Sequence, residues 1–496
     1  MDLIAIVHTF AVCALAIQAL HHTALLLVFL FGSKPRPCFS RASSASDALP
    51  RVTVQVPIYN ERAVVERVLC AVAAQDYPSD RLRIQVLDDS DDETRFIVCR
   101  VVERLRAQGV RVELIQREAR QGFKAGALAE GLRHTEDDLI AIFDADFVPP
   151  PDFLRRAIAE SAAFADPHVG FVQARWTFAN AEHSAVTRAQ KVMLDVHFVV
   201  EQTARASAGL PISFNGSAGI WRRECILDAG GWQADTLTED LDLCYRAQMR
   251  GWRGAYLPWL CIPSELPSEA LSYKRQQARW ARGTVQVLRK VLPMMLHAPW
   301  SWLQRIAALF HLSGYFIHAW VLLTALTTPL LVLRWMFGGE PLLPAWVGAL
   351  GMLCTLPTFA LVLAQRAQGV CWSDSLKALP FALALGIGVS LSNTVAMLSA
   401  LLNLGAGTFE RTPKRGALWR SPYPLRADWT LWAELLLACY SGVAAAMVFQ
   451  HSAWLAALPL LLYSLGFGFT AAAQLLALAQ EQPRRIVAWR RSGRGV

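Results

Sequence analysis

Two long apolar regions flank a central region in which apolar and polar positions alternate at short intervals. The run Leu3–Phe31 is too long for a signal-peptide core and has no basic leader. We therefore expect residues 1–33 to form an uncleaved membrane anchor with its N-terminus outside. A linker over residues 34–50 leads to a mixed domain over residues 51–300. Residues 301–480 are again mostly apolar, which predicts a membrane region after the domain.

The central region repeats a short β-rich run followed by a segment with helical spacing. Strand signals cover residues 51–58, 84–87, 110–115 and 139–143, and helical signals cover residues 64–74, 95–108 and 124–133. This alternation predicts an α/β domain with a parallel sheet that is covered by helices. In such sheets ligands bind beyond the carboxyl ends of the strands.

The C-terminal region contains four apolar runs that can each cross about 30 Å of hydrocarbon. They lie near residues 305–335, 343–365, 430–450 and 453–478. A fifth run, 376–404, could cross the membrane or lie as a helix in its interface. Crossing would put the basic segment Arg411–Arg420 and the basic tail, 481–496, outside, whereas an in-plane helix keeps both inside, where Lys and Arg are favoured. We therefore expect one crossing before the domain and four after it.

Two further segments, residues 187–208 and 270–291, are long, helical and mixed in polarity. Each could be an ordinary domain helix or an interfacial helix that holds the domain against the bilayer. We favour the interfacial interpretation for residues 270–291, because this segment runs into the first apolar run of the C-terminal region.

Composition supports a membrane protein with one soluble domain. The 496 residues are 54% hydrophobic and 18% charged, against about 25% charged residues in a typical soluble chain. The net charge of +8 includes many Lys and Arg beside apolar runs, which is typical of the positive-inside rule and argues against nucleic acid as a partner. The ten Cys show no C-x-x-C spacing, which predicts reduced structural thiols and a cytoplasmic domain. The helical patterns around Cys70, Cys99 and Cys244 predict buried positions.

Two acidic clusters follow predicted strands. Asp88 and Asp89 could belong to a solvated turn that caps a helix, or could accept hydrogen bonds from a nucleobase or ribose. Asp144 and Asp146 form a D-x-D sequence, which is common without a function. At the carboxyl end of a strand, however, such a pair can hold a hard divalent cation against a diphosphate. The metal would then neutralise charge on the departing diphosphate.

A third acidic cluster, Thr238-Glu239-Asp240, opens an amphipathic segment. A Thr followed by two acids suits a capped helix N-terminus, which needs no further function. The alternative is a general base. Sugar transfer with inversion requires a carboxylate that removes the proton of the acceptor hydroxyl as this hydroxyl attacks the anomeric carbon.

A fourth cluster, Gln276 to Trp280, lies on a predicted helix. The spacing places Gln276, Arg279 and Trp280 on one face. The Trp could stack on a sugar and the planar Arg could bind phosphate, or the two could be an interfacial Trp with a snorkelling Arg. Lys124, in Gly-Phe-Lys-Ala-Gly, could contact a diphosphate or be solvated at a helix start.

These four clusters, in this order, resemble the series D, D-x-D, T-E-D and Q-x-x-R-W of the processive family 2 glycosyltransferases, which include the cellulose synthases. The resemblance covers residues 51–420. Within this family, residues 214–223 and 274–280 are similar to those of cellulose synthase-like enzymes that make mannan or glucan backbones. The resemblance implies a GT-A fold inserted between transmembrane helices, with an active site that leads into a channel between them.

The resemblance also implies a role for each matching residue. It assigns donor binding to Asp88, Asp89, Lys124, Asp144, Gln276 and Arg279, Mg²⁺ or Mn²⁺ binding to Asp144 and Asp146, catalysis to Asp240 and Glu239, and acceptor binding to Trp280 and Asn215. Cellulose synthases also carry a gating loop that reads F-x-V-T-x-K after an interface helix. Phe409–Lys414 keeps the Phe, Thr and Lys of that loop but has Arg in place of Val. This match implies a gating-like loop over residues 405–428, assigns Thr412 and Lys414 to donor binding and supports the in-plane interpretation of residues 376–404.

We therefore expect a multi-pass enzyme of the cell inner membrane with a cytoplasmic catalytic domain. It would transfer a hexose from UDP-glucose or GDP-mannose, with inversion, to a growing β-linked polysaccharide; its partners would be the nucleotide sugar, a glycan or lipid acceptor and membrane lipid. One alternative is a glycolipid synthase that adds a single sugar to a lipid, because ceramide-type glucosyltransferases have a similar R-W motif. A second is a non-catalytic scaffold or transporter subunit, which would be expected to have lost a carboxylate or the Trp.

Overall fold

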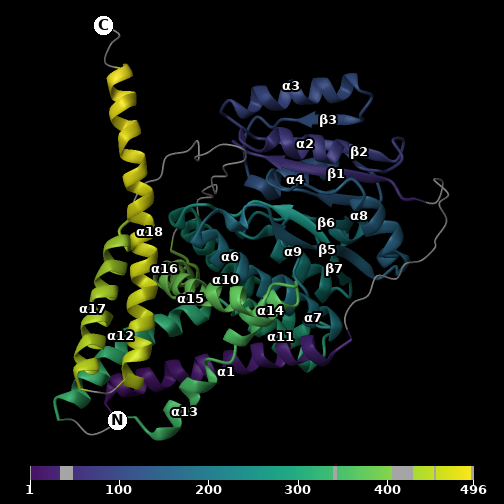
Figure 1. Cartoon of the computed structure of the whole chain (residues 1–496). Coiled ribbons are helices and arrows are strands. Elements are labelled where there is room, and N and C mark those ends of the chain that lie inside the picture. Colours follow the sequence, from purple (N-terminus) through teal and green to yellow (C-terminus); the bar gives the residue numbers. More distant parts are fainter. Residues whose placement is uncertain (1, 34–48, 339–342, 405–427, 452–453, 493–496) are drawn as a thin grey trace.

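A mixed sheet of seven strands forms the centre of the domain (Figure 1), in a computed structural model that describes residues 2–33, 49–338, 343–404, 428–451 and 454–492. The strands are β1 (Val52–Ile58), β2 (Leu82–Asp88), β3 (Val112–Ile115), β4 (Leu139–Ile142), β5 (Val169–Phe178), β6 (Gly219–Arg222) and β7 (Arg253–Ser264). Their order across the sheet is β3-β2-β1-β4-β6-β5-β7. The first four are the strands that the sequence predicts, with ends that agree within two residues.

The predicted strands form the parallel half of the sheet. Strand β1 lies between β2 and β4 and pairs Ile58 with Asp88 and Gln55 with Ile142. Because β2 and β4 run in the same direction, the acidic clusters that follow them emerge at the same edge of the sheet. The domain therefore has the predicted arrangement at the place where the candidate chemistry lies.

The four predicted strands are parallel as expected, but the complete sheet is mixed, because β6 runs antiparallel to both of its neighbours, β4 and β5. Strand β5 ends at the carboxyl edge, and the helices that follow it return the chain to that same edge before β6 begins at Gly219. Strand β6 therefore starts where β4 ends, and Gly219 pairs with Ile142. This reversal places residues 215–217 beside the acids that follow β4.

Helices cover both faces of the sheet. Those of the domain are α2 (Val65–Ala73), α3 (Thr94–Ala107), α4 (Phe123–Arg133), α5 (Phe153–Arg155), α6 (Ala185–Asp195), α7 (Gln202–Ser207), α8 (Arg223–Asp228), α9 (Glu239–Met249) and α10 (Ala270–His297), with a π-helical segment, η5 (Val196–Glu201), between α6 and α7. Alternate side chains of β4 enter different cores: Leu139 and Ala141 pack with α2 and α3, whereas Ile140 and Ile142 pack with α4, α9 and α10. The sheet is thus buried on both faces, as expected for an α/β domain.

Six segments in the described parts of the chain are long and apolar enough to cross a membrane. They are Leu3–Phe31, Phe316–Met336, Ala345–Arg366, Trp372–Leu401, Thr430–Gln450 and Ala456–Ala479. One precedes the domain, as predicted, and five follow it, against the four that we expect to cross. The segment that we expected to lie in plane, 376–404, meets the same criteria of length and hydropathy as the rest, so its in-plane position stays a prediction.

Several apolar runs are divided into two helices. The membrane-side helices are α1 (Leu3–Phe31), α11 (Trp302–Leu312), α12 (Phe316–Met336), α13 (Ala345–Leu353), α14 (Thr358–Arg366), α15 (Trp372–Gly388), α16 (Ser390–Leu401), α17 (Thr430–Gln450) and α18 (Trp454–Ser492). Figure 1 shows α17 and α18 side by side at one flank and α1 running below the domain. Helix α10 packs against α9 on the domain side and against α16 on the membrane side. Helix α10 therefore connects the domain to the apolar helices, as do the contacts of α6 with α15 and of α7 with α1. The interfacial position of α10 stays a prediction.

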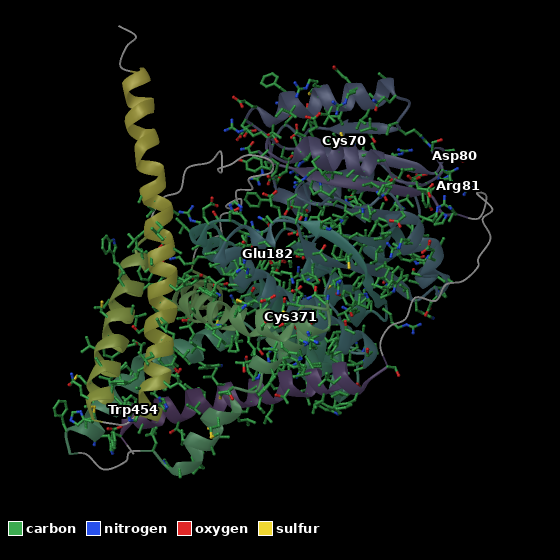
Figure 2. All side chains as sticks on the ribbon, in the orientation of Figure 1. Cys70, Asp80, Arg81, Glu182, Cys371 and Trp454 are labelled. Atoms are coloured by element: carbon green, nitrogen blue, oxygen red, sulfur yellow. The ribbon has the colours of Figure 1, made fainter. Side chains whose placement is uncertain are left out.

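The cysteines in the described residues are free, in agreement with the prediction of reduced thiols. Figure 2 shows the exposed Cys70 and Cys371 in separate parts of the molecule. Cys244 is buried as predicted and Cys99 is partly exposed. The prediction for Cys70 is wrong, because α2 buries the face that carries Val65, Val68 and Leu69 and turns Cys70 toward solvent.

Candidate active site

The D-x-D cluster lies directly after β4, where the chain leaves the sheet. The backbone N–H of Asp144 donates to Oγ of Ser217 at 2.9 Å, so the start of β6 holds the end of β4 in place. Both Asp144 and Asp146 line a common cavity. Burial first, and then the negative charge of Asp146, raises the pKa of Asp144. The two carboxylates therefore share a partly desolvated position that favours a bound cation.

Lys124 lies opposite these carboxylates. Its Nζ atom is 2.6 Å from Oδ1 of Asp144 and 3.7 Å from Oε1 of Glu239, and it donates to the carbonyl oxygen of Gly216 at 2.8 Å. Burial alone would lower the pKa of Lys124, but the charges of Asp144 and Glu239 raise it above its usual value. Lys124 is therefore a permanent positive charge at the carboxyl edge of the sheet.

The turn before α4 determines where Lys124 points. Gly122 and Phe123 both have positive φ, +72° and +49°, which turns the chain sharply into the helix. Arg117 donates to the carbonyl oxygens of Gln121, at 2.7 Å, and Phe123, at 3.0 Å, and so clamps this turn. The local sequence thus places Lys124 in the first turn of α4, from which it enters the site.

Asp240 lies in the first turn of α9, next to Glu239. Burial, followed by the negative charge of Glu239, raises the pKa of Asp240 to about 7, although the positive charge of Lys124 acts in the opposite direction. Gly216 lies against this carboxylate: a Cβ atom at that position would be 3.2 Å from Oδ2 of Asp240, and φ is +79°. Only a glycine can make this approach without strain. A carboxylate whose pKa lies near neutrality is suited to general base catalysis.

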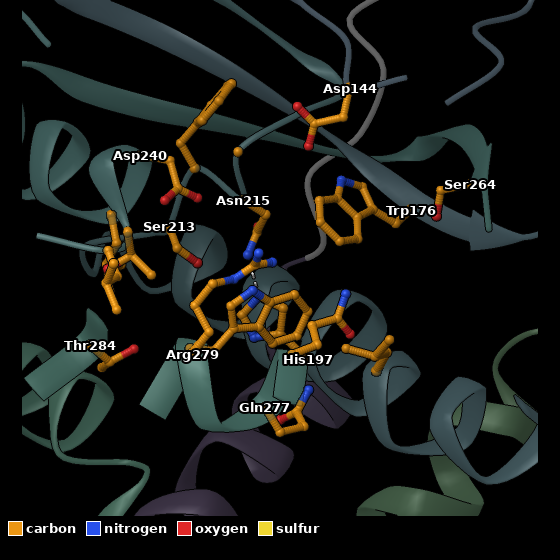
Figure 3. A pocket seen from close by; sticks show the side chains of 18 of the residues that line it. Asp144, Trp176, His197, Ser213, Asn215, Asp240, Ser264, Gln277, Arg279 and Thr284 are labelled. Atoms are coloured by element: carbon orange, nitrogen blue, oxygen red, sulfur yellow. Dashed lines mark hydrogen bonds between the residues drawn. The ribbon is translucent and has the colours of Figure 1, made fainter. Parts of the chain in front are cut away.

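Helix α10 brings the Gln276–Trp280 cluster to the same place. Gln276, Arg279 and Trp280 all line the cavity. Burial lowers the pKa of Arg279, while the carboxylates of Glu239, Asp144 and Asp240 act to raise it, so this guanidinium faces the acidic edge. Figure 3 shows the Arg279 side chain extending into the cavity between Asp240 and His197.

A close contact between α10 and the start of α9 makes this arrangement possible. A Cβ atom at Gly283 would lie 2.6 Å from Cγ2 of Thr238, so only a glycine lets the two elements approach to this distance. Thr238 immediately precedes the acids of α9. The glycine therefore determines how near Arg279 and Trp280 come to Asp240.

The two adjacent acids at the end of β2, Asp88 and Asp89, have different surroundings. Asp88 is buried, accepts hydrogen bonds from Gln116 at 3.1 Å and from the backbone of Ser90 at 3.0 Å, and does not line the cavity. Asp89 lines the cavity and accepts two hydrogen bonds from Arg117, one of them at 2.9 Å from Nε. The structure therefore brings Asp89 into the site and keeps Asp88 beside it. The nucleoside-binding role of both stays a prediction.

Apart from Asp88, the candidate side chains in the described residues line one cavity of about 540 Å³. Its lining from the domain includes Asp89, Lys124, Asp144, Asp146, Asn215, Glu239, Asp240, Gln276, Arg279 and Trp280. Its lining from the membrane side includes His21 and His22 of α1, His311 of α11 and His318 of α12. The cavity is thus continuous from the carboxyl edge of the sheet to helices of the apolar regions. Thr412 and Lys414 lie outside the described residues.

Several lining residues were not identified from the sequence. His197 and Glu201 of η5 and Trp176 of β5 face the cavity, and Arg117 contacts Asp89. The i, i+4 spacing of His197 and Glu201 was visible, but it lies within residues 187–208, which a helical pattern alone explains. For Arg117 no sequence signal distinguishes it from the many other Arg residues of the domain.

The residues present fit a divalent cation. Within the described parts of the chain, no group of three or more His, Cys, Asp or Glu side chains could hold a metal without other ligands. Asp144 and Asp146 nevertheless supply two carboxylates at one edge of the cavity, with Lys124 and Arg279 nearby to contact an anion. Mg²⁺ is commonly bound in this way, by one or two carboxylates together with phosphate oxygens of the substrate.

Comparisons with known proteins give matches to glycosyltransferases. The family model described as "Glycosyltransferase like family 2" matches residues 50–283. Glucomannan 4-beta-mannosyltransferase 1 of Oryza sativa subsp. japonica is 44% identical over 251 residues, which cover 50% of this chain and 48% of that protein. Glucomannan 4-beta-mannosyltransferase 2 of Arabidopsis thaliana is 42% identical over 278 residues, covering 54% and 52%. The chain therefore spans about half the length of these curated relatives.

Among solved structures, a mannosyltransferase from Pyrobaculum calidifontis, in complex with GDP-Man and Mn²⁺, superposes with a TM-score of 0.55. The two sequences are 22% identical, and the match covers 80% of this chain and 100% of that one. At this identity the likeness concerns the fold, which is the GT-A fold that the sequence motifs imply.

Proposed function

Because the family model described as "Glycosyltransferase like family 2" matches residues 50–283, we propose that this chain is an inverting membrane glycosyltransferase that extends a β-linked polysaccharide, with GDP-mannose as its donor. The identities of 44% and 42% to glucomannan 4-beta-mannosyltransferases support both the β-linkage and the mannosyl donor. UDP-glucose is the second donor to test, because the family motifs do not distinguish the two nucleotide sugars.

One observation carries the proposal: the acids of three separate sequence regions and the Arg-Trp pair of α10 line a single cavity. Asp144 follows β4, Asp240 opens α9 and Arg279 lies on α10, yet Lys124 and Arg279 are both under the electrostatic influence of the same carboxylates. A structural cluster of acids would have no need of a cavity large enough for a sugar nucleotide.

The geometry supports a direct displacement. Asp240 takes the proton of the acceptor hydroxyl, whose oxygen attacks the anomeric carbon while the bond from that carbon to the diphosphate oxygen breaks. Lys124 and Arg279 place positive charge where the diphosphate gains negative charge. Asp144 and Asp146 would hold a divalent cation, which would supply further positive charge for the departing diphosphate. Glu239 stays next to Lys124 and keeps its ammonium aimed at the site.

The acceptor side of the cavity supports a growing glycan. Trp280 offers an aromatic face for a sugar ring, and the cavity continues to lining residues of α1, α11 and α12. A chain extended at Asp240 can therefore pass toward the apolar helices. We propose that the domain lies on the cytoplasmic side of the inner membrane, where nucleotide sugars are made, with the basic segments on the same side.

The test is an incorporation assay with purified protein in detergent or nanodiscs. Radiolabelled GDP-mannose, UDP-glucose and UDP-N-acetylglucosamine are each supplied with Mg²⁺ or Mn²⁺, and products are separated by size. We expect a polymeric product from GDP-mannose, loss of this product in Asp240→Asn, and wild-type product in the control Asp80→Asn, whose carboxylate is exposed. A single labelled sugar on a lipid would instead support a glycolipid synthase. Absence of any product, or equal activity of Asp240→Asn, would disprove the proposal.

A further inference from the structure

A chain of hydrogen bonds connects the loop before β6 to the π-helical segment η5. It begins at Gln202, whose side-chain amide is held by the backbone of Ser213. Oε1 of Gln202 accepts from the N–H of Ser213 at 3.2 Å, and Nε2 donates to the carbonyl oxygen of Ser213 at 2.7 Å. Because a backbone N–H can only donate and a carbonyl can only accept, the orientation of the Gln202 amide is determined.

The orientation of Gln202 determines that of Asn215. Nε2 of Gln202 also donates to Oδ1 of Asn215 at 3.0 Å, so the Nδ2 group of Asn215 is turned toward His197. The distance from Nδ2 of Asn215 to Nε2 of His197 is 3.0 Å, and Figure 3 shows these two side chains meeting in the cavity. An amide N–H at this position requires a lone pair on the ring nitrogen.

His197 must therefore be neutral, with its proton on Nδ1. That nitrogen lies 3.1 Å from Oε2 of Glu201, which accepts the proton in a hydrogen bond. Burial alone would raise the pKa of Glu201, but the hydrogen bond from His197 and the charge of Arg205 hold it well below its usual value. Glu201 is thus an ionised acceptor, which stabilises the Nδ1–H tautomer of His197.

The chain ends on a buried cation. Nε of Arg205 donates to Oε1 of Glu201 at 3.1 Å, and Nη2 donates to the carbonyl oxygen of Ala307, in α11, at 3.2 Å. Arg205 is fully buried. The ring of His311 also lies over that of His197, with centroids 6.5 Å apart. The network is therefore anchored to α11, the first membrane-side helix after the domain. It passes through a π-helical segment, a feature that is frequent at functional sites.

We propose that His197 is a positioning residue for the acceptor sugar. As a neutral ring protonated on Nδ1, it holds the Asn215 amide so that one amide hydrogen is bound and the other is left for a ligand in the cavity. Asn215 directly precedes Gly216, whose carbonyl oxygen accepts from Lys124 and whose Cα lies against Asp240. The Asn215 amide thus lines the same cavity as the proposed base, where an acceptor hydroxyl must be oriented. This inference rests on the proposed transferase function.

Two substitutions separate positioning from a merely structural role. His197→Phe keeps an aromatic ring but removes the acceptor for Asn215, whereas His197→Gln places Oε1 near the position of Nε2 and restores an acceptor. We measure turnover of GDP-mannose with mannohexaose as the added acceptor, and hydrolysis of GDP-mannose without an acceptor. For His197→Phe we expect the KM for mannohexaose to rise about tenfold, as for a lost hydrogen bond, while the donor KM and the hydrolysis rate stay near wild type. His197→Gln should recover most of the acceptor KM.

The opposite pattern would overturn the inference. If His197→Phe leaves the acceptor KM unchanged, or lowers acceptor transfer and donor hydrolysis by the same factor, His197 has no positioning role. The wild-type reaction serves as the separate test of the proposed function, since absence of any turnover of GDP-mannose and UDP-glucose by the wild type disproves the transferase itself.

A measurement that needs no enzymatic turnover distinguishes failure of the positioning role of His197 from failure of the transferase function. Hydrogen–deuterium exchange of the full-length protein in detergent reports on residues 213–217, where the N–H of Asn215 donates to Oε1 of Gln173 at 2.9 Å. We expect exchange in this loop to be about tenfold faster in His197→Phe and close to wild type in His197→Gln. Equal exchange in the wild type and His197→Phe would show that His197 does not hold the loop, whatever reaction the protein catalyses.

Discussion

The ammonium nitrogen of Lys124 lies 2.6 Å from Oδ1 of Asp144, at the edge of the sheet where β4 ends. The same nitrogen is 3.7 Å from Oε1 of Glu239, so a single cation connects the D-x-D cluster to the start of α9. Lys124 therefore neutralises part of the repulsion between these acids before a ligand enters. In the proposed reaction, the same charge would be available to the oxygens of the donor diphosphate.

Replacing Lys124 should affect the chemical step more than folding. Lys124→Met removes the positive charge near the diphosphate, and we expect kcat to fall about 10²- to 10³-fold, the usual effect of losing one preorganised donor. Lys124→Arg should retain part of the rate because it keeps the charge. Lys377→Met, at an exposed lysine, is the control. Initial rates with labelled GDP-mannose measure the effect, and a kcat of Lys124→Met within threefold of wild type would exclude this role.

The pH dependence of the reaction should report on Asp240. Its pKa is raised to about 7 by burial and by the charge of Glu239, and a general base acts only when ionised. We expect kcat/KM, which reports on the free enzyme, to fall about tenfold per pH unit below about 7. Because Lys124 acts to lower the pKa of Asp240, the fall in Lys124→Met should begin at a higher pH. Rates from pH 5 to 9 test both expectations, and a flat profile down to pH 5 would contradict them.

Asp240→Asn should lower the transfer activity and raise the stability of the fold. The folded protein binds the Asp240 proton more tightly than the unfolded chain between the usual pKa of 3.8 and about 7, so stability falls as the pH rises through this window. Above it, the ionised carboxylate destabilises the fold, and the Asn variant avoids this cost. We expect a higher thermal midpoint at pH 8 without metal, a smaller increase at pH 5, and transfer reduced about 10²- to 10⁴-fold. A lower midpoint at pH 8 would show that the carboxylate stabilises the fold.

Removal of divalent cations should stop transfer reversibly. Chelation by EDTA should abolish incorporation, and added Mg²⁺ or Mn²⁺ should restore it. Asp146→Asn removes one proposed ligand, so we expect the metal concentration for half-maximal activity to rise by roughly tenfold or more. Asp152→Asn, at a more exposed carboxylate, should behave like the wild type. Full activity in EDTA would exclude a metal-dependent reaction.

A buried ion pair should control how α10 is held by the membrane-side helices. Nζ of Lys274 lies 2.9 Å from Oε1 of Glu434 in α17 and 3.1 Å from Oε1 of Gln474 in α18, and all three residues are buried. Lys274→Met leaves Glu434 without its cation and should lower the free energy of unfolding by about 3–5 kcal/mol. The double variant Lys274→Met/Glu434→Leu removes both charges and should be much closer to wild type. The free energies of unfolding of the wild type, the single variants and the double variant are compared in detergent. If the losses of the two single variants add up to the loss of the double variant, the two residues are not coupled.

Local patterns were sufficient to predict the parallel half of the sheet. The strands that lead to Asp89 and Asp144 are short, β-rich runs between helical segments, and their predicted ends agree with the structure within two residues. Strands β5, β6 and β7 were not predicted. The direction of β6 depends on where α7 returns the chain, which is a matter of packing and leaves no pattern in a four-residue strand.

Adjacent residues of the site illustrate the same limit of local information. The sequence pattern does not distinguish Asp88 from Asp89. In the structure, Gln116 and Ser90 donate hydrogen bonds to Asp88, whereas Arg117 donates to Asp89. Of the two acids, only Asp89 lines the cavity. His197 could not be identified as a site residue from the sequence for a related reason. A His four residues before a Glu fits any helix, and its connection to Asn215 exists only when η5 packs beside the loop before β6.

The sequence by itself determined the class of fold, the alternation of membrane and soluble regions and the four clusters of reactive side chains, because periodicity and short motifs are properties of neighbouring residues. Only the tertiary structure decided which of those side chains share a cavity, how burial raises the pKa of Asp240 and which side chain His197 contacts. These properties depend on burial and on contacts between residues far apart in the chain, and such distances are set by how the elements pack.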